Sequence, residues 1–97
     1  MPAYVIFNAE SIEDPEPLAE YKQAALPTVI AAGGKVSVAY GRQEVVEGPP
    51  LVGVVMIEFP TYEQATTCYH SDAYRQARAL REGATTLRAV IVEGLGG

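Results

Sequence analysis

The chain has 97 residues, of which 48% are hydrophobic and 20% are charged, a composition that predicts one globular domain over residues 1–97 and excludes intrinsic disorder. Its net charge of −5 argues against nucleic acid as a partner, because phosphate binding needs a basic surface. Acidic residues gather in the first quarter and arginines near the end, which indicates solvated faces or, alternatively, an anion pocket beneath the arginines.

The first strand is predicted over about residues 3–9, where consecutive apolar residues indicate cover on both faces. A helix over about 15–32 follows, with Asp14 as its N-terminal cap and proline at its first position. Gly33 would end it, because a helix C-terminus favours a residue with positive φ. Spacings of three and four predict one buried stripe, made of Leu18, Tyr21, Ala25, Val29 and Ala32.

A second strand is predicted over about 35–40, and residues 44–46 could resume it as a bulged or edge strand. The prolines within 48–50 break any strand there, because proline cannot donate to a sheet ladder. The third strand, 51–59, is apolar at almost every position, whereas a strand with one wet face alternates. This strand therefore needs cover on both faces.

The second helical region is predicted in two pieces. Thr61 and Gln64 form a capping pattern that begins a helix over about 62–69, and Ser71 caps a further helix after a break. A last strand over about 86–93 and a loose tail over 94–97 complete the chain. The predicted inner stripe of the later helix is Ala73, Ala77, Leu80 and Ala84, with Gly83 as the exit.

This order of elements predicts an α+β fold, a ferredoxin-like βαββαβ split sandwich with an antiparallel sheet and an interrupted second helix. The helices would cover one face of the sheet and leave the other face apolar. At about 25 cal/mol per Å², exposing several valines and isoleucines would forgo several kcal/mol of burial. We therefore expect a homodimer that packs through the open face of the sheet.

Six segments, by their order and spacing, carry a resemblance to other proteins: they are Ala3-Tyr4-Val5-Ile6, Tyr21, Gly33-Gly34-Lys35, Glu58-Phe59-Pro60-Thr61, Tyr69-His70-Ser71-Asp72-Ala73-Tyr74 and Ala77-Arg78-Ala79-Leu80-Arg81. Together they resemble a known bacterial family, catalogued as domain of unknown function 1330. The resemblance covers nearly the whole chain and implies a dimeric α+β barrel, similar to cofactor-free monooxygenases and muconolactone isomerases, but it implies no established reaction. Where the family often has Ser-Pro-Glu-Tyr, this chain has Ser-Asp-Ala-Tyr at 71–74, and the aspartate can still serve a helix start.

His70 is the candidate catalytic residue, because imidazole is the side chain that ordinarily titrates near neutral pH. The helix break could turn its ring toward a cleft, and the alternative is a polar loop residue. One histidine without a close carboxylate or thiol gives no metal ligand set, and Cys68 does not converge with it on a helix. We therefore predict no metal, and Cys68 is predicted to pack.

Three residues of the last helix are candidates for substrate binding. Tyr74, Arg78 and Arg81 share one arc and could line a pocket between helix and sheet. An arginine can hold a carboxylate through two hydrogen bonds, and a tyrosine can donate to a carbonyl or enolate oxygen. In the alternative, the arginines pair with surface acids and the tyrosine packs.

Two further candidates lie outside that helix. Glu58 interrupts an apolar strand and could be a buried base, or it could pair with Arg88 on a neighbouring strand, which we favour. Tyr21 would pack in the first helix with its hydroxyl at the rim of a pocket.

No phosphate loop, dinucleotide-binding motif or paired-cysteine motif is present, so no cofactor is predicted. Two functions stay open. One is a cofactor-independent enzyme acting on a small apolar or aromatic molecule with a carbonyl or carboxylate group. The other is a non-catalytic dimer that binds a small ligand or has a structural role. The fold does not decide whether the protein is an enzyme.

The expected compartment is the cytoplasm. The chain begins with neither a basic segment nor a cleavable apolar segment, and no apolar run approaches the ~18 residues that a membrane helix needs. Its single cysteine excludes a disulfide within the chain, and a free thiol fits a reducing compartment.

Overall fold

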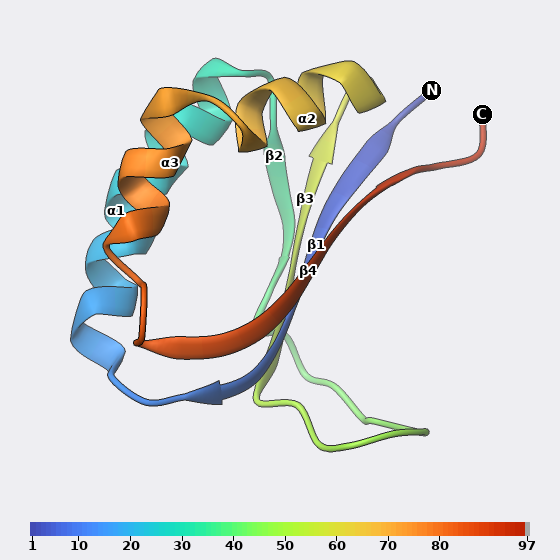
Figure 1. Cartoon of the computed structure of the whole chain (residues 1–97). Helices are drawn as coiled ribbons and strands as arrows, with labels where there is room; N and C mark the ends of the chain where they lie inside the picture. The colour runs from blue at the N-terminus through green and yellow to red at the C-terminus, as the bar shows by residue number, and fades with distance from the viewer. Residues whose placement is uncertain (97) are drawn as a thin grey trace.

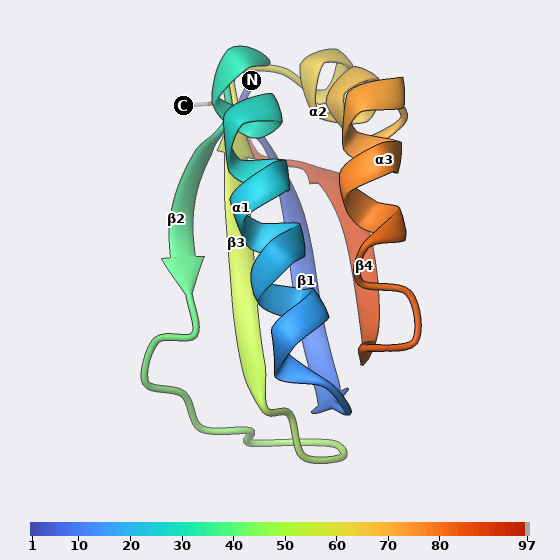
Figure 2. The same ribbon diagram turned by 90° about the vertical axis from the view of Figure 1, so that its left-hand side faces the viewer.

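A computed structural model of the chain describes residues 1–96, in which three helices lie on one side of a four-stranded sheet (Figures 1 and 2). The sheet is antiparallel with the strand order β2-β3-β1-β4. The predicted ferredoxin-like α+β fold, with its interrupted second helix, is confirmed. In chain order the elements are β1 (Ala3–Ile12), α1 (Pro15–Ala31), β2 (Lys35–Ala39), β3 (Gly53–Phe59), α2 (Tyr62–Tyr69), α3 (Asp72–Ala79) and β4 (Thr85–Glu93).

The helix ends follow their capping residues. The Asp14 side chain accepts from the Glu16 backbone N–H at 3.3 Å, and Gly33, with φ +90°, follows the last turn of α1. The Thr61 side chain accepts from the Gln64 backbone N–H at 3.1 Å and begins α2. Ser71 accepts from the Tyr74 backbone N–H at 3.2 Å, so it begins α3 and separates that helix from α2.

The two faces of the sheet differ in cover. Val5 and Phe7 of β1, with Ile57 and Phe59 of β3, point toward the helices and are buried in the core. The alternate residues point to the other side, where no helix lies (Figure 1). We call these residues the open sheet face: Tyr4, Ile6, Val38, Val54, Met56, Val90 and Val92.

The predicted inner stripe of the later helix is wrong at two positions. Ala73 and Leu80 are exposed, with 43% of Leu80 accessible, whereas Tyr74 is only 2% exposed. Because the phenol ring buries far more area than an alanine, α3 turns Tyr74 toward the core. Ala77 and Ala84 are buried as predicted.

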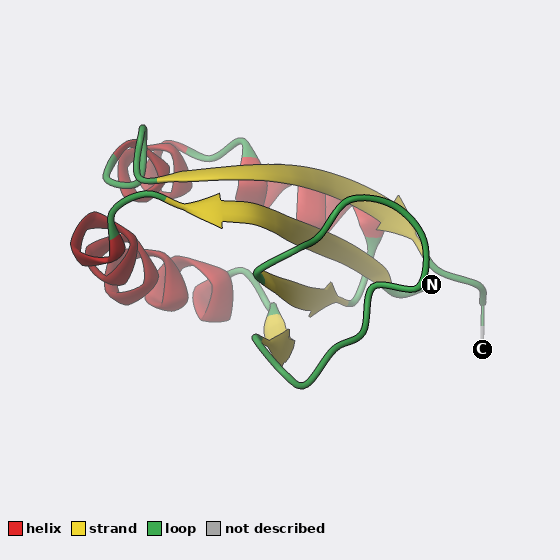
Figure 3. Ribbon diagram, turned by 90° about the horizontal axis from the view of Figure 1, so that it is seen from below, coloured by secondary structure: helices red, strands yellow, loops and turns green. Residues whose placement is uncertain are grey.

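The segment 40–52 forms a long loop without a strand, so the possible strand over 44–46 is wrong. The loop extends beyond the sheet on the side away from the helices (Figures 1 and 3). Gly48 has a positive φ of 99° and is followed by two prolines, which cannot extend a ladder. The Gln43 side chain donates to the Leu51 carbonyl at 2.8 Å and ties the two ends of the loop together.

The predicted pairing of Glu58 with Arg88 is also wrong. Strand β1 lies between β3 and β4, so the two residues are not on neighbouring strands. In the register, Glu58 lies opposite Tyr4, whereas Arg88 lies opposite Asn8.

The ends of the chain meet at one edge of the fold. The Gly94 backbone N–H donates to the Pro2 carbonyl at 2.8 Å, so the tail predicted as loose over 94–97 is held at its first residue. Gly97 lies outside the described residues. Across residues 1–96, no helix has the length and apolar character to cross a membrane.

Candidate functional site

A cleft of about 290 Å³ lies between α1 and the β2 half of the sheet. Helix α1 leaves the edge strand β2 uncovered (Figure 2), and Val36, Ala39 and Tyr40 at that edge line the cleft. Its lining is apolar except for Tyr21, Lys22 and Tyr40. Its apolar lining residues include Phe7, Leu18, Leu26, Val29, Ile57 and Leu87.

Tyr21 joins this cleft to a buried polar cluster. Its hydroxyl lies 2.5 Å from the Tyr74 hydroxyl, and the two rings meet edge to face with centroids 6.1 Å apart. The guanidinium carbon of Arg81 lies 4.8 Å from the Tyr21 ring centre and 6.0 Å from that of Phe7. Arg81 Nε is buried without a hydrogen-bond partner in the described chain. One polar group of the cluster is therefore unsatisfied.

The cluster sets the charge of its members. Burial, and then the neighbouring Tyr21, raises the pKa of the Tyr74 hydroxyl above its ordinary value, although Arg81 opposes this shift. Burial lowers the pKa of Arg81, but its interactions with Tyr21 and Tyr74 outweigh burial and raise it overall. Tyr74 is therefore a neutral phenol beside a charged guanidinium.

The rings of Tyr21, Tyr74 and Tyr69 contact one another in sequence, and we call them the aromatic row. Sequence reasoning did not identify Tyr69 as a site residue. Its ring lies 5.1 Å from that of Tyr74. Arg78 Nη1 donates to the Tyr69 hydroxyl at 3.2 Å, and the guanidinium lies over the same ring at 5.2 Å. The His70 ring meets Tyr69 edge to face at 5.5 Å, but His70 is exposed and does not line the cleft.

The structure therefore divides the predicted site residues. Tyr21, Tyr74 and Arg81 come together, and of these three only Tyr21 lines the cleft. Arg78 and His70 gather around Tyr69 instead, and Glu58 is exposed on the opposite side of the sheet.

The mouth of the cleft holds a second group that sequence reasoning missed. Lys22 Nζ lies 4.0 Å from the centre of the Tyr40 ring. This contact joins α1 to the end of β2. Tyr40 has φ +55°, a left-handed conformation that is rare for a bulky residue. A Cβ atom added at Gly53 would lie 2.2 Å from Tyr40 Cδ1, so the ring rests on this glycine. A glycine inside an apolar strand was the available signal, because it often marks such an approach.

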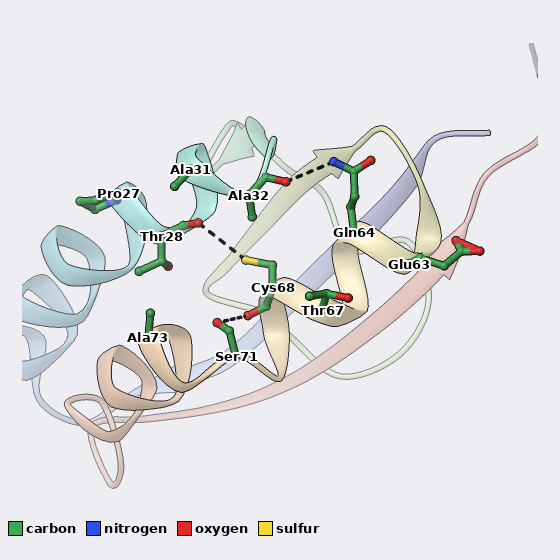
Figure 4. A pocket seen from close by; sticks show the side chains of 10 residues that line it. All are labelled: Pro27, Thr28, Ala31, Ala32, Glu63, Gln64, Thr67, Cys68, Ser71 and Ala73. Atoms are coloured by element: carbon green, nitrogen blue, oxygen red, sulfur yellow. Dashed lines mark hydrogen bonds between the residues drawn. The ribbon is translucent and has the colours of Figure 1, made fainter.

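A second hollow, of about 620 Å³, lies between the end of α1 and helices α2 and α3 (Figure 4). It is more open to solvent than the cleft, and several of its polar groups bind backbone carbonyls. Cys68 Sγ donates to Thr28 O at 3.9 Å, and Ser71 Oγ donates to Cys68 O at 2.7 Å (Figure 4). Cys68 is buried in the core and packs there, as predicted, and this burial raises the pKa of its thiol. The cleft is therefore the better candidate site.

Metal binding has no defined site in the described chain. Among residues 1–96, no three His, Cys, Asp or Glu side chains gather where they could share one ion.

Comparison with solved structures shows the same fold in several proteins. A protein of unknown function from Rhodopseudomonas palustris, RPA0582, has a TM-score of 0.79 at 19% identity, with 99% of this chain and 84% of that chain covered. An ethyl tert-butyl ether d (ethd) family protein from Bacillus halodurans C-125 has a TM-score of 0.63 at 17% identity, with 98% and 100% covered.

A third structure comes from Bacteroides fragilis and is described as a dimeric protein of unknown function with a ferredoxin-like fold. Its TM-score is 0.55 at 13% identity, with 96% of each chain covered. At these identities the likeness extends to the fold alone.

Sequence comparison assigns the family. No curated protein matches the chain. A family model described as Domain of unknown function (DUF1330) matches residues 2–95, nearly the whole chain. This protein therefore belongs to the family called Domain of unknown function (DUF1330).

Proposed function

We propose that this protein is a homodimer that binds a small, largely apolar or aromatic molecule in the cleft between α1 and the sheet. The observation that carries the proposal is the cleft itself, about 290 Å³ in volume, with apolar walls and three residues bearing polar groups. Small-molecule sites have this character, because apolar walls supply affinity and a few polar groups fix orientation.

The open sheet face supports the dimer. Val90 and Val92 are 48% and 42% exposed in the single chain, and Ile6, Val54 and Met56 lie beside them on the same face. Burying these side chains against a second copy would remove apolar area from water. The dimeric ferredoxin-like protein from Bacteroides fragilis offers a precedent in another member of the fold.

Cofactor-independent catalysis on a carbonyl compound is a second candidate, and the cluster of Tyr21, Tyr74 and Arg81 favours it. A phenol backed by a second phenol and a charged guanidinium can stabilise negative charge that develops on a carbonyl or enolate oxygen. His70 would serve as proton carrier only if a ligand or partner copy reached it, since its exposed ring lies outside the cleft. Ligand binding is therefore the better supported function.

The buried free thiol of Cys68 supports placing this dimer in the cytoplasm, because thiols persist in reducing compartments.

Ligand binding is tested by filling the cleft. Ala39 lines it, so Ala39→Phe should occupy its space, whereas Ala24→Phe adds the same ring on the exposed outer side of α1. We expect octan-1-ol, octanoate or 3-phenylpropanol to raise the melting temperature of the wild type and of Ala24→Phe, because a ligand that binds only the folded state stabilises it. Ala39→Phe should lose this response. No response in the wild type, or equal responses in all three proteins, would contradict ligand binding in the cleft.

A further inference from the structure

Lys22 at the mouth of the cleft has no role in an apolar site. We infer that it is an anion-binding residue, and that the ligand of the cleft is an amphipathic carboxylic acid. The apolar part of the acid would fill the cleft, and its carboxylate would bind the Lys22 ammonium group at the mouth. This inference rests on the proposed function, since it names the class of molecule that the cleft takes.

Lys22 is a cation without a carboxylate partner on its own helix. The positions three and four residues away, where helical side chains meet, hold Leu18, Ala19, Ala25 and Leu26. The cleft lining contains no acidic residue and no other cation. In a chain of net charge −5, this positive charge therefore stands alone at an apolar opening.

The Lys22 side chain also has a defined position. Its ammonium group lies 4.0 Å from the centre of the Tyr40 ring, at the end of β2. An ammonium group on an aromatic face keeps its N–H donors free for an anion. The contact thus holds the charge at the opening between α1 and β2.

The backbone under Tyr40 fixes that contact. Its amide donates to the Val54 carbonyl at 2.9 Å, although φ is +55°. Its ring occupies the space where any side chain at Gly53 would have to begin. A strained residue persists where its surroundings over-determine it, and such residues gather at ligand clamps. Tyr40 therefore acts as a positioning residue for Lys22.

The donors at the mouth suit a carboxylate better than a phosphate. One ammonium group offers a single positive charge on a flexible stem, whereas phosphate sites add an arginine fork or a row of backbone amides. Arg81 lies against Tyr21 and Phe7 and does not line the cleft. A monoanion with an apolar body matches this arrangement.

The test compares matched acids and alcohols by titration calorimetry, with octanoate against octan-1-ol and 3-phenylpropionate against 3-phenylpropan-1-ol. Lys35, the only other lysine, lies on β2 opposite Glu58, so Lys35→Met is the matched control for Lys22→Met. We expect the wild type to bind each acid at least about tenfold more tightly than its alcohol, because a charge-assisted hydrogen bond is added. Lys22→Met should remove this preference and keep the affinity for the alcohols, and Lys35→Met should change neither.

Two further results follow, one from the role of Tyr40 and one from the charge of Lys22. Tyr40→Phe keeps the ring and should keep the preference for acids, whereas Tyr40→Ala should reduce it. Raising the salt concentration should lower the affinity for the acids and leave the affinity for the alcohols unchanged, since salt screens exposed charges.

The outcomes separate the two proposals. Alcohols that bind as tightly as the acids, or an acid preference that survives in Lys22→Met, would overturn the carboxylate assignment and leave the cleft as a neutral ligand site. If neither acids nor alcohols bind the wild type, both the assignment and the proposed function fail.

Discussion

Both faces of the sheet are apolar, but only one of them is covered by helices. Along β3, Val55, Ile57 and Phe59 point to the helices, and Val54 and Met56 point away from them. The helix side is closed but underfilled at the β2 edge, where the cleft lies. No helix of residues 1–96 covers the open sheet face, although residues of the 40–52 loop share a hollow with Asn8 and Val90. An underfilled covered face fits a small ligand, and an uncovered flat face fits a second copy.

The largest predicted effect comes from disrupting the proposed dimer interface on the open sheet face. Val54→Asp places a charge without a partner in the proposed dimer interface, which costs about 3–5 kcal/mol and weakens association by about a thousandfold. Sedimentation velocity at micromolar concentration should show a dimer for the wild type and a monomer for the variant. Ala24→Asp adds the same charge on the outer side of α1 and should stay dimeric. A wild-type chain that sediments as a monomer would rule out this use of the face.

A smaller effect is expected on the helix side, at the mouth of the cleft. Gly53→Ala places a Cβ atom 2.2 Å from Tyr40 Cδ1, so the ring must move and stability should fall by about 1–3 kcal/mol. Chemical denaturation measures the loss. Gly41→Ala is the matched control, because an added Cβ there meets nothing within 4 Å. Combining Gly53→Ala with Tyr40→Ala should recover part of the loss, and simple additivity would show that the ring does not rest on the glycine.

The smallest effect concerns the buried end of the aromatic row, at alkaline pH. Burial and Tyr21 raise the pKa of the Tyr74 hydroxyl above its ordinary value of about 10, so the folded chain keeps a proton that the unfolded chain releases. This contribution to stability is complete below pH ~10 and is lost as the pH rises further, by at most about 1.4 kcal/mol per pH unit.

The free energy of unfolding, measured by chemical denaturation between pH ~8 and pH ~11, should therefore fall more steeply with pH for the wild type than for Tyr74→Phe. Tyr62 is 40% exposed, so Tyr62→Phe should behave as the wild type. Parallel curves for the wild type and Tyr74→Phe would mean that the phenol is not held neutral by burial.

The sequence predicted the fold well, because its main signals are local. Asp14, Thr61 and Ser71 cap helices through contacts two or three residues away, and the apolar run of β3 indicates cover on both faces. The inner stripe of the later helix was predicted less well, because Tyr74 is buried against the core whereas Ala73 and Leu80 are exposed. A stripe built from apolar residues left out Tyr74, whose polar hydroxyl lies beside the Tyr21 hydroxyl.

The candidate site was predicted only in part, because its remaining contacts are not local. Lys22 lies on α1, Tyr40 at the start of the loop after β2, and Gly53 on β3. No propensity predicts a positive φ at a tyrosine. The error at Glu58 and Arg88 has the same origin, because strand order decides which strands are neighbours and local pattern does not.

The assignment of one face to ligand and the other to a second copy is tested most directly by NMR, with backbone amide shifts followed during a titration with octanoate. We expect shifts to change for residues around the cleft, on α1 from Leu18 to Val29 and over residues 36–40 of β2 and the start of the loop, while the dimer persists. Changes centred on Ile6, Val54 and Val90 of the open sheet face, with release of monomer, would contradict it.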